Sequence, residues 1–195
     1  MESDADTVRR NVMVAMTVLP LTGGAALAEP ARQSVGRGSN TLVAYFSRSG
    51  NTRVVAGLVQ RALGADLFEI QSASPYPDDY VATVEEARKE RDSGRERALA
   101  SRVRDIGRYE TVFLGFPIWG ETVPPVVRAF LSAHDLSGTV LIPFVTHGGY
   151  GLGDSRAVLN RAAPKAQIQQ GFAMEADQER RTMNQVNDWL QSVHT

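Results

Sequence analysis

Short apolar segments alternate with amphipathic segments from residue 41 to the end of the chain. Runs rich in apolar and β-branched residues have the length of buried strands and occupy 41–46, 66–70, 111–116, 139–145 and, more weakly, 167–172. Helical segments follow these runs: those at 53–63, 124–131, 155–162 and 177–193 carry apolar residues on one face, and the one at 81–91 is charged. The charges at 81–91 are interpreted as a solvated face with i, i+4 pairs and no further role. This alternation predicts an α/β fold: a doubly wound, five-stranded parallel sheet with helices on both faces.

The first 28 residues have a different pattern. Arg9 and Arg10 precede a mildly apolar stretch that ends in Ala26-Leu27-Ala28, which is typical of a signal peptide with its cleavage site. The paired arginines loosely fit a twin-arginine leader. An uncleaved N-terminal extension is the alternative. We therefore expect a signal peptide over 1–28, a flexible lead-in over 29–40, one domain over 41–195, and a protein exported from the cytoplasm.

Composition narrows the function classes. The leader carries two of the 21 basic and three of the 22 acidic residues, so the remainder holds 19 of each, and this balance argues against a nucleic-acid or anionic-membrane binder. The apolar stretch of the leader is too weak for a stable membrane span. The chain has no cysteine, and its three histidines lack metal-ligand spacing, so neither thiol chemistry nor a metal site is expected. His134 and His194 are interpreted as surface residues near helix ends.

Ser47 to Thr52 connects the first predicted strand to the first predicted helix and is rich in hydroxyl groups. The first amides of a helix have no partners within the helix and carry about half a positive elementary charge, so such a turn is typical of an anion site. Gly50 lets the backbone close around a phosphate. An ordinary turn with Asn51 or Thr52 as N-cap is the alternative. The chain has neither a Walker loop nor a G-x-G-x-x-G fingerprint, which leaves a phosphate site without a required metal.

Two further unusual loops follow the third and fourth predicted strands. The first carries Trp119 and Gly120, and the second places four glycines around Tyr150. Because ligands bind at the carboxyl ends of parallel strands, these loops and the hydroxyl-rich turn predict one shared site. Trp119 and Tyr150 are expected to stack on the two faces of a planar ring. A packing role for Trp119 and simple flexibility for the glycines are the alternatives.

These three loops contain the motifs YFSRSGNT, GFPIWGET and THGGYGLG, in that order. With them, residues 41–193 resemble the flavodoxin family, whose five-stranded doubly wound sheet binds FMN. The resemblance implies phosphate contacts from Ser47, Arg48 (through its backbone), Ser49, Gly50, Asn51 and Thr52. It implies contacts to the flavin ring from Pro117, Ile118, Trp119, Gly120, Thr146, His147, Gly148, Gly149 and Tyr150. The fifth strand has no long insertion, as in the short form of the fold.

The resemblance leaves the exact role open. Electron-carrier flavodoxins are usually strongly acidic, whereas this domain is neutral. The alternatives are an electron carrier with a redox partner protein, an FMN-dependent oxidoreductase acting on quinones with NAD(P)H, and a module that stores or delivers flavin without turnover. By the resemblance, the Gly120 carbonyl accepts a hydrogen bond from the proton that flavin N5 gains on one-electron reduction, and Glu121 disfavours an anionic reduced ring. His147 either donates to the ring or binds it only through its backbone.

Overall fold

The computed structural model describes residues 39–175 and 179–193. The expected signal peptide and nearly all of the expected lead-in lie outside these residues, as does His194, so those expectations stay predictions. No helix within the described ranges is both long and apolar enough to cross a membrane.

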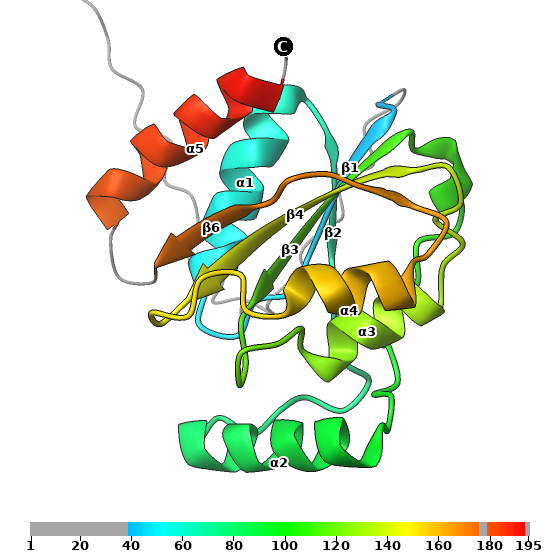
Figure 1. Cartoon of the computed structure of the whole chain (residues 1–195), viewed down its shortest axis with the longest axis vertical. Coiled ribbons are helices and arrows are strands. Elements are labelled where there is room, and N and C mark those ends of the chain that lie inside the picture. The colour runs from blue at the N-terminus through cyan, green and yellow to red at the C-terminus, as the bar shows by residue number, and fades with distance from the viewer. Residues whose placement is uncertain (1–38, 176–178, 194–195) are drawn as a thin grey trace, which may run out of the picture. The chain divides into compact units, whose positions relative to one another are not determined.

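The centre of the domain is a parallel sheet (Figure 1). Its strand order is β2-β1-β3-β4-β5, with β6 also paired to β4, and every pairing is parallel. The strands are β1 (Thr41–Tyr45), β2 (Asp66–Glu69), β3 (Thr111–Pro117), β4 (Val140–His147), β5 (Gln167–Ile168) and β6 (Phe172–Glu175). The predicted doubly wound fold is confirmed.

The prediction of one continuous fifth strand over 167–172 was wrong, because two short segments share that position beside β4. The carbonyls of Thr139 and Leu141 accept bonds from the fifth strand, so alternate residues of β4 face it and Pro143 faces it as well. Proline has no N–H to donate, and the ladder stops there. Gly171 passes so close that a Cβ would lie 2.8 Å from both the ring and the carbonyl oxygen of Pro143. The interruption covers only residues 169–171.

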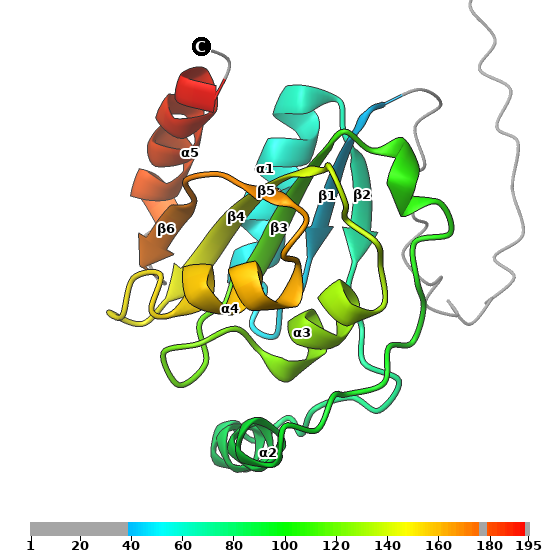
Figure 2. The same cartoon turned by 45° about the vertical axis from the view of Figure 1, so that its right-hand side comes forward.

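Helices cover both faces of the sheet, as predicted (Figures 1 and 2). On one face, Val55 and Val59 of α1 and Val186 of α5 pack against Val43 and Phe113 of the sheet. The other face carries α3 and α4, packed against strand residues that alternate with those of the first face. The helices are α1 (Asn51–Leu63), α2 (Tyr80–Ser93), α3 (Pro125–Ser132), α4 (Ser155–Ala162) and α5 (Glu179–Val193), with a 3₁₀ turn at Ile106–Arg108.

Helix α2 lies away from the sheet, next to α3 (Figure 2). Its side chains are mostly exposed, and its described buried residues are only Thr83 and Ala87. The charges of this segment form one expected i, i+4 pair, Arg88 with Asp92 at 3.6 Å. They were expected to have no further role, which is wrong for Glu86 and Glu90, because both bind the buried Arg97.

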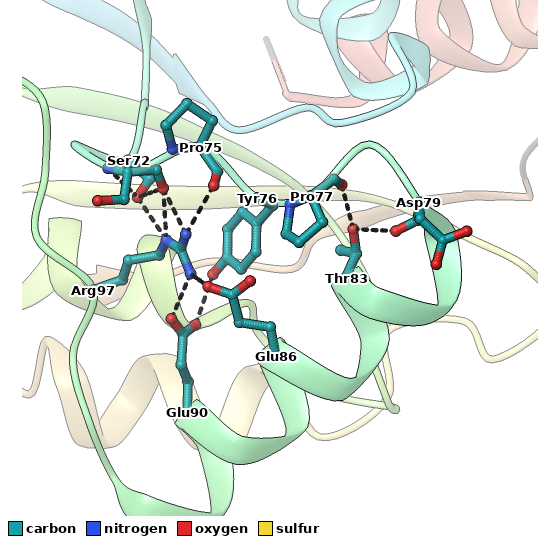
Figure 3. A network of polar contacts seen from close by, with 10 residues as sticks. Ser72, Pro75, Tyr76, Pro77, Asp79, Thr83, Glu86, Glu90 and Arg97 are labelled. Carbon is teal, nitrogen blue, oxygen red and sulfur yellow. Dashed lines mark hydrogen bonds and ion pairs between the residues drawn. The ribbon is translucent and has the colours of Figure 1, made fainter.

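Arg97 is the centre of a polar cluster that holds α2 (Figure 3). Its side chain is only 7% exposed and donates to Glu86 at 2.5 Å and to Glu90 at 2.6 Å. It also donates to the Ser72 hydroxyl and to the carbonyls of Ser74 and Pro75 in the loop before α2. This one cation therefore joins the helix to the loop that precedes it.

The expectation that His134 is a surface residue was wrong. The ring is half-buried: Nδ1 donates to the Phe130 carbonyl at 2.7 Å and Nε2 accepts from the Val103 amide at 3.0 Å. Burial lowers the pKa of His134, which fits a neutral ring that uses one nitrogen as donor and the other as acceptor.

Candidate functional site

The carboxyl ends of β1, β3 and β4 lie side by side in the sheet, and the three unusual loops begin there. The register pairs Tyr45 with Gly115 and Pro117 with Thr146. Gly115 is required in the middle of β3, since a Cβ there would collide with the Phe144 ring from β4. Close packing of the sheet thus brings the three loops to one edge.

The first loop has the donors of an anion site. Gly50 precedes α1 with φ 97°, a left-handed conformation that favours glycine, and it is the N-cap in place of Asn51 or Thr52. Its amide donates to the Ser47 hydroxyl at 3.1 Å. The backbone amides of Ser49, Asn51 and Thr52 donate to no residue in the described part of the chain. These amides are therefore available to a ligand.

Two residues of the first loop are directed elsewhere. The Arg48 guanidinium donates to the Asp78 carbonyl at 2.6 Å, so its side chain ties the loop to the segment before α2. Thr52 is 1% exposed, and its hydroxyl lies 2.8 Å from that of Thr146. The Thr52 hydroxyl thus links the first loop to β4 inside the protein, while its amide stays at the start of the helix.

The second loop contains a tight turn in which Trp119 and Thr122 exchange both backbone hydrogen bonds, at 3.1 and 3.2 Å. Its central residues, Gly120 and Glu121, both have positive φ, 55° and 66°. Such turns are dominated by glycine, asparagine and aspartate, so Glu121 is strained. The conformation persists because the Asp154 amide donates to the Glu121 carbonyl at 2.9 Å, and Gly153 packs so tightly there that a Cβ would collide with this carbonyl.

The Trp119 side chain is partly buried among aromatic rings. It makes edge contacts with Phe46, at 5.3 Å between centroids, and with Tyr76, at 4.9 Å. Tyr76 in turn lies under the Arg97 guanidinium, 3.8 Å from its ring centroid, and donates to Glu90. Burial, helped by the neighbouring Glu90, raises the pKa of Tyr76, so its hydroxyl stays a donor. Trp119 is therefore positioned by the Arg97 cluster.

The third loop joins β4 to α4. Pro117 and Ile118 lie beside its start, where the Ile118 amide donates to the Thr146 carbonyl at 2.8 Å. His147 ends β4, and its Nδ1 accepts from the Gly149 amide at 3.0 Å, which leaves Nε2 as the nitrogen that carries the proton of a neutral ring. Tyr150 is 62% exposed at the end of the loop, and a Cβ at Gly148 or Gly149 would meet no atom within 4 Å.

The predicted site residues therefore form one assembly at the sheet edge, in which Thr146 contacts both other loops. The contributions of Phe46, Tyr76 and Arg97 were missed. Phe46 was visible as the last residue of the first predicted strand, but Tyr76 and Arg97 lie in segments without periodicity. No group of histidine, aspartate and glutamate side chains among the described residues could hold a metal ion.

The strand order, the helices on both faces and the three loops at the carboxyl edge define a flavodoxin-like doubly wound domain. The family model for flavodoxin matches residues 40–193, and the chain belongs to this family.

Solved structures agree with this assignment. A candidate flavoprotein from Bacteroides eggerthii is 31% identical with a TM-score of 0.68, and the match covers 80% of this chain and 98% of that one. A candidate flavoprotein from Bacteroides uniformis is 28% identical with a TM-score of 0.66, covering 77% and 99%. A Lactobacillus acidophilus flavoprotein in complex with FMN is 19% identical with a TM-score of 0.61, covering 74% and 97%. The comparison with curated proteins gave no match.

Proposed function

We propose that the domain binds FMN non-covalently between the three loops and transfers electrons through it. The observation that carries this proposal is the junction at Thr146, whose hydroxyl pairs with Thr52 and whose carbonyl accepts from Ile118. These bonds hold the first loop, which would bind the phosphate, and the second and third loops, which would bind the flavin ring, at one edge of the sheet. Membership of the flavodoxin family and the FMN complex of the Lactobacillus acidophilus flavoprotein support the choice of ligand.

The donor set of the first loop fits the phosphate of FMN. Three amides that have no acceptor among the described residues, from Ser49, Asn51 and Thr52, surround the start of α1, and the exposed Ser49 adds a hydroxyl. A Cβ at Gly50 would meet no atom within 4 Å, so the loop leaves open space there. One compact group of donors suits a single terminal phosphate better than the pyrophosphate of FAD.

The ring loops supply hydrophobic and polar contacts for a flat flavin. Trp119, held by Phe46 and Tyr76, offers a fixed aromatic surface, and the exposed Tyr150 offers a second ring. The unpacked backbone at Gly148 and Gly149 can approach the polar edge of the ring. When bound, the flavin supplies the redox chemistry, and these residues orient it and set its potentials.

The decisive experiment is a titration of apoprotein from residue 29 onward with FMN and, separately, with FAD. Flavin fluorescence should be quenched by stoichiometric FMN and much more weakly by FAD. Quenching by FAD but not by FMN would overturn the assignment.

Within this proposal, Gly120 controls the proton at flavin N5. The Gly120 carbonyl is the acceptor of a hydrogen bond from protonated N5. The Gly120–Glu121 peptide that carries it lies at the centre of the turn, between two residues with positive φ. Replacing Gly120 with Val should disfavour the turn and destabilise the one-electron reduced form by about 1 to 3 kcal/mol. A redox titration should then show a lower first potential while FMN stays bound. An unchanged potential would remove Gly120 from this role.

The balanced charge of the domain favours a second candidate, an FMN-dependent NAD(P)H:quinone oxidoreductase, over a carrier that depends on electrostatic steering. Steady-state oxidation of NADPH by a quinone should be compared with electron uptake from a reductase protein. Rapid turnover with the quinone supports the oxidoreductase, and fast uptake without quinone turnover supports the carrier. Stable FMN binding with neither activity would indicate a flavin-delivery or storage module.

We also propose that the protein is exported with its cofactor in place, which requires a route for folded proteins such as the twin-arginine system. Arg9 and Arg10 before the apolar stretch motivate this proposal. Replacing both with Lys should keep the protein in the cytoplasmic fraction. Mature protein outside the cytoplasm in this variant would exclude the twin-arginine route but not secretion.

A further inference from the structure

A hollow of about 570 Å³ lies beside the second loop, outside the proposed FMN contacts except at Gly120. Its walls come from α2, from Glu96 three residues after that helix, from the turn at Gly120–Thr122, from α3, and from α4 with the loop before it. Its volume is in the range of pockets that bind small molecules. It exists because the Arg97 cluster holds α2 next to α3 without packing it onto the sheet (Figures 2 and 3).

Three arginines from three different helices line this hollow: Arg91 of α2, Arg128 of α3 and Arg161 of α4. Arg91 is paired with its neighbour Asp92 at 3.0 Å. The guanidinium groups of Arg128 and Arg161 make no hydrogen bond or ion pair with any residue in the described ranges, and the Nε of Arg128 is buried without an acceptor. A buried donor without an acceptor is uncommon in folded proteins.

Three carboxylates also line the hollow, from Glu96, Glu121 and Asp154. Glu96 accepts from the Ser132 hydroxyl at 2.6 Å, and all three residues are exposed to solvent. Water therefore solvates these carboxylates, whereas Arg128 is only partly exposed and has lost part of its hydration. The oppositely charged groups do not pair across the hollow, which leaves room for a ligand between them.

We propose that this hollow binds a small anionic molecule and that Arg128 and Arg161 hold its carboxylate or phosphate group. Guanidinium groups match both anions by forming two parallel hydrogen bonds. Gly120 belongs to the hollow and also to the proposed FMN site, and Arg91 lies so close to Gly120 that a Cβ there would be 2.8 Å from its Nη1. If the proposed function is correct, the bound anion is a reaction partner or effector of the flavin.

The test is isothermal titration of the FMN-loaded protein with two probes, succinate and inorganic phosphate. Saturable binding of succinate alone identifies an organic carboxylate as the ligand class, binding of phosphate alone identifies a phosphate compound, and binding of both identifies a general anion site. Absence of saturable binding of either probe at millimolar concentration would overturn the proposal.

Variants locate the binding site. Arg128→Gln and Arg161→Gln should each weaken binding of the probe by about tenfold or more, the loss expected for one charge-assisted contact. Arg156→Gln is the matched control, because Arg156 is exposed on α4 and does not line the hollow. Equal binding by all three variants would overturn the proposal.

Two further measurements keep the result interpretable. Arg128→Lys retains the positive charge but cannot form two parallel hydrogen bonds to one anion. It should therefore bind the probe more tightly than Arg128→Gln, if Arg128→Gln remains folded. FMN fluorescence quenching of every variant tests the flavin site separately. Normal FMN binding without anion binding rejects the anion site alone. Anion binding by a protein that fails to bind FMN rejects the proposed function and the link to the flavin but retains the anion site.

Discussion

Helices α1 and α2 each follow a strand of the sheet, β1 and β2, yet they are held by different forces. Val55, Ala56 and Val59 of α1 are almost completely buried against the sheet. Helix α2 instead depends on one buried guanidinium, that of Arg97, and on the capping of its first turn by Asp79. The first loop is therefore held in place by the hydrophobic core under α1. The second loop depends on the Arg97 cluster, because Tyr76 of that cluster contacts Trp119.

The difference predicts different responses to mutation. An apolar interface loses energy in proportion to the atoms removed, whereas a buried ionic cluster fails when its central charge is removed. A change in α1 should lower the global stability and leave the Trp119 turn intact. A change in the Arg97 cluster should disturb the Trp119 turn as well.

The largest expected effect is that of Arg97→Met. This change leaves Glu90 partly buried without its cation and removes the bonds to Ser74 and Pro75, so the free energy of unfolding should fall by about 3 kcal/mol. Urea unfolding measures the loss of stability. The Trp fluorescence of the native state, before unfolding begins, should also change because Tyr76 no longer holds Trp119.

Arg88→Met is the matched control on α2, because its pair with Asp92 is solvent-exposed, and its effect should stay below about 0.5 kcal/mol. Equal effects of the two changes would show that the cluster does not hold the helix.

Val59→Ala tests the apolar side of the comparison. Val59 is completely buried between α1 and the sheet, and removing two methyl groups should lower the free energy of unfolding by about 2 kcal/mol. The native Trp fluorescence and the affinity for FMN should change little. The exposed Val54 of the same helix is the control, since Val54→Ala should be nearly neutral. A change of native fluorescence as large as that of Arg97→Met would contradict the separation of the two regions.

Ser49→Ala and Thr52→Ala separate binding from stability within the first loop. The exposed Ser49 hydroxyl is free to contact phosphate, so its loss should weaken FMN binding by about 1.5 kcal/mol without changing apoprotein stability. The buried Thr52 hydroxyl pairs with Thr146, so its loss should lower apoprotein stability by about 1 kcal/mol. Fluorescence titration and urea unfolding of the same samples measure both quantities. The assignment fails if Thr52→Ala leaves apoprotein stability unchanged.

The smallest expected effect is the pH dependence from His134, which anchors Val103 in the segment that follows Arg97. Burial lowers the pKa of His134 in the folded protein, so below the unfolded value of about 6.5 the unfolded state binds more protons. The stabilisation should be complete above about pH 6.5 and disappear as the pH falls toward the folded pKa.

The measurement compares urea unfolding of wild type and His134→Gln between pH 7.5 and 5.5. The stability difference between the two proteins should shrink as the pH falls, because glutamine does not titrate. His147→Gln is the control variant, and its stability should differ from that of wild type by the same amount at every pH. Parallel pH curves for wild type and His134→Gln would reject this role.

Much of the molecule follows from the sequence alone. The alternation of apolar runs and amphipathic segments determined the doubly wound sheet, and four of the five predicted strands lie within two residues of their observed ends. Ser47 to Thr52 and the loops at Trp119 and Tyr150 were recognisable because their residue types are unusual after a buried strand. Their meeting at one edge also followed, because the carboxyl ends of parallel strands necessarily lie together.

The tertiary structure decided what local pattern does not encode. Pro143 interrupts the fifth strand, but the direction in which its missing N–H would point depends on the register with the neighbouring strands. Arg97 lies in a segment without periodicity, and its five partners are separated from it by 7 to 25 residues. Thr52 and Thr146 are 94 residues apart and meet only when β1 and β4 lie on either side of β3. Hydrophobic periodicity reports which side of an element is buried, whereas the partners of a buried polar group are set by long-range packing.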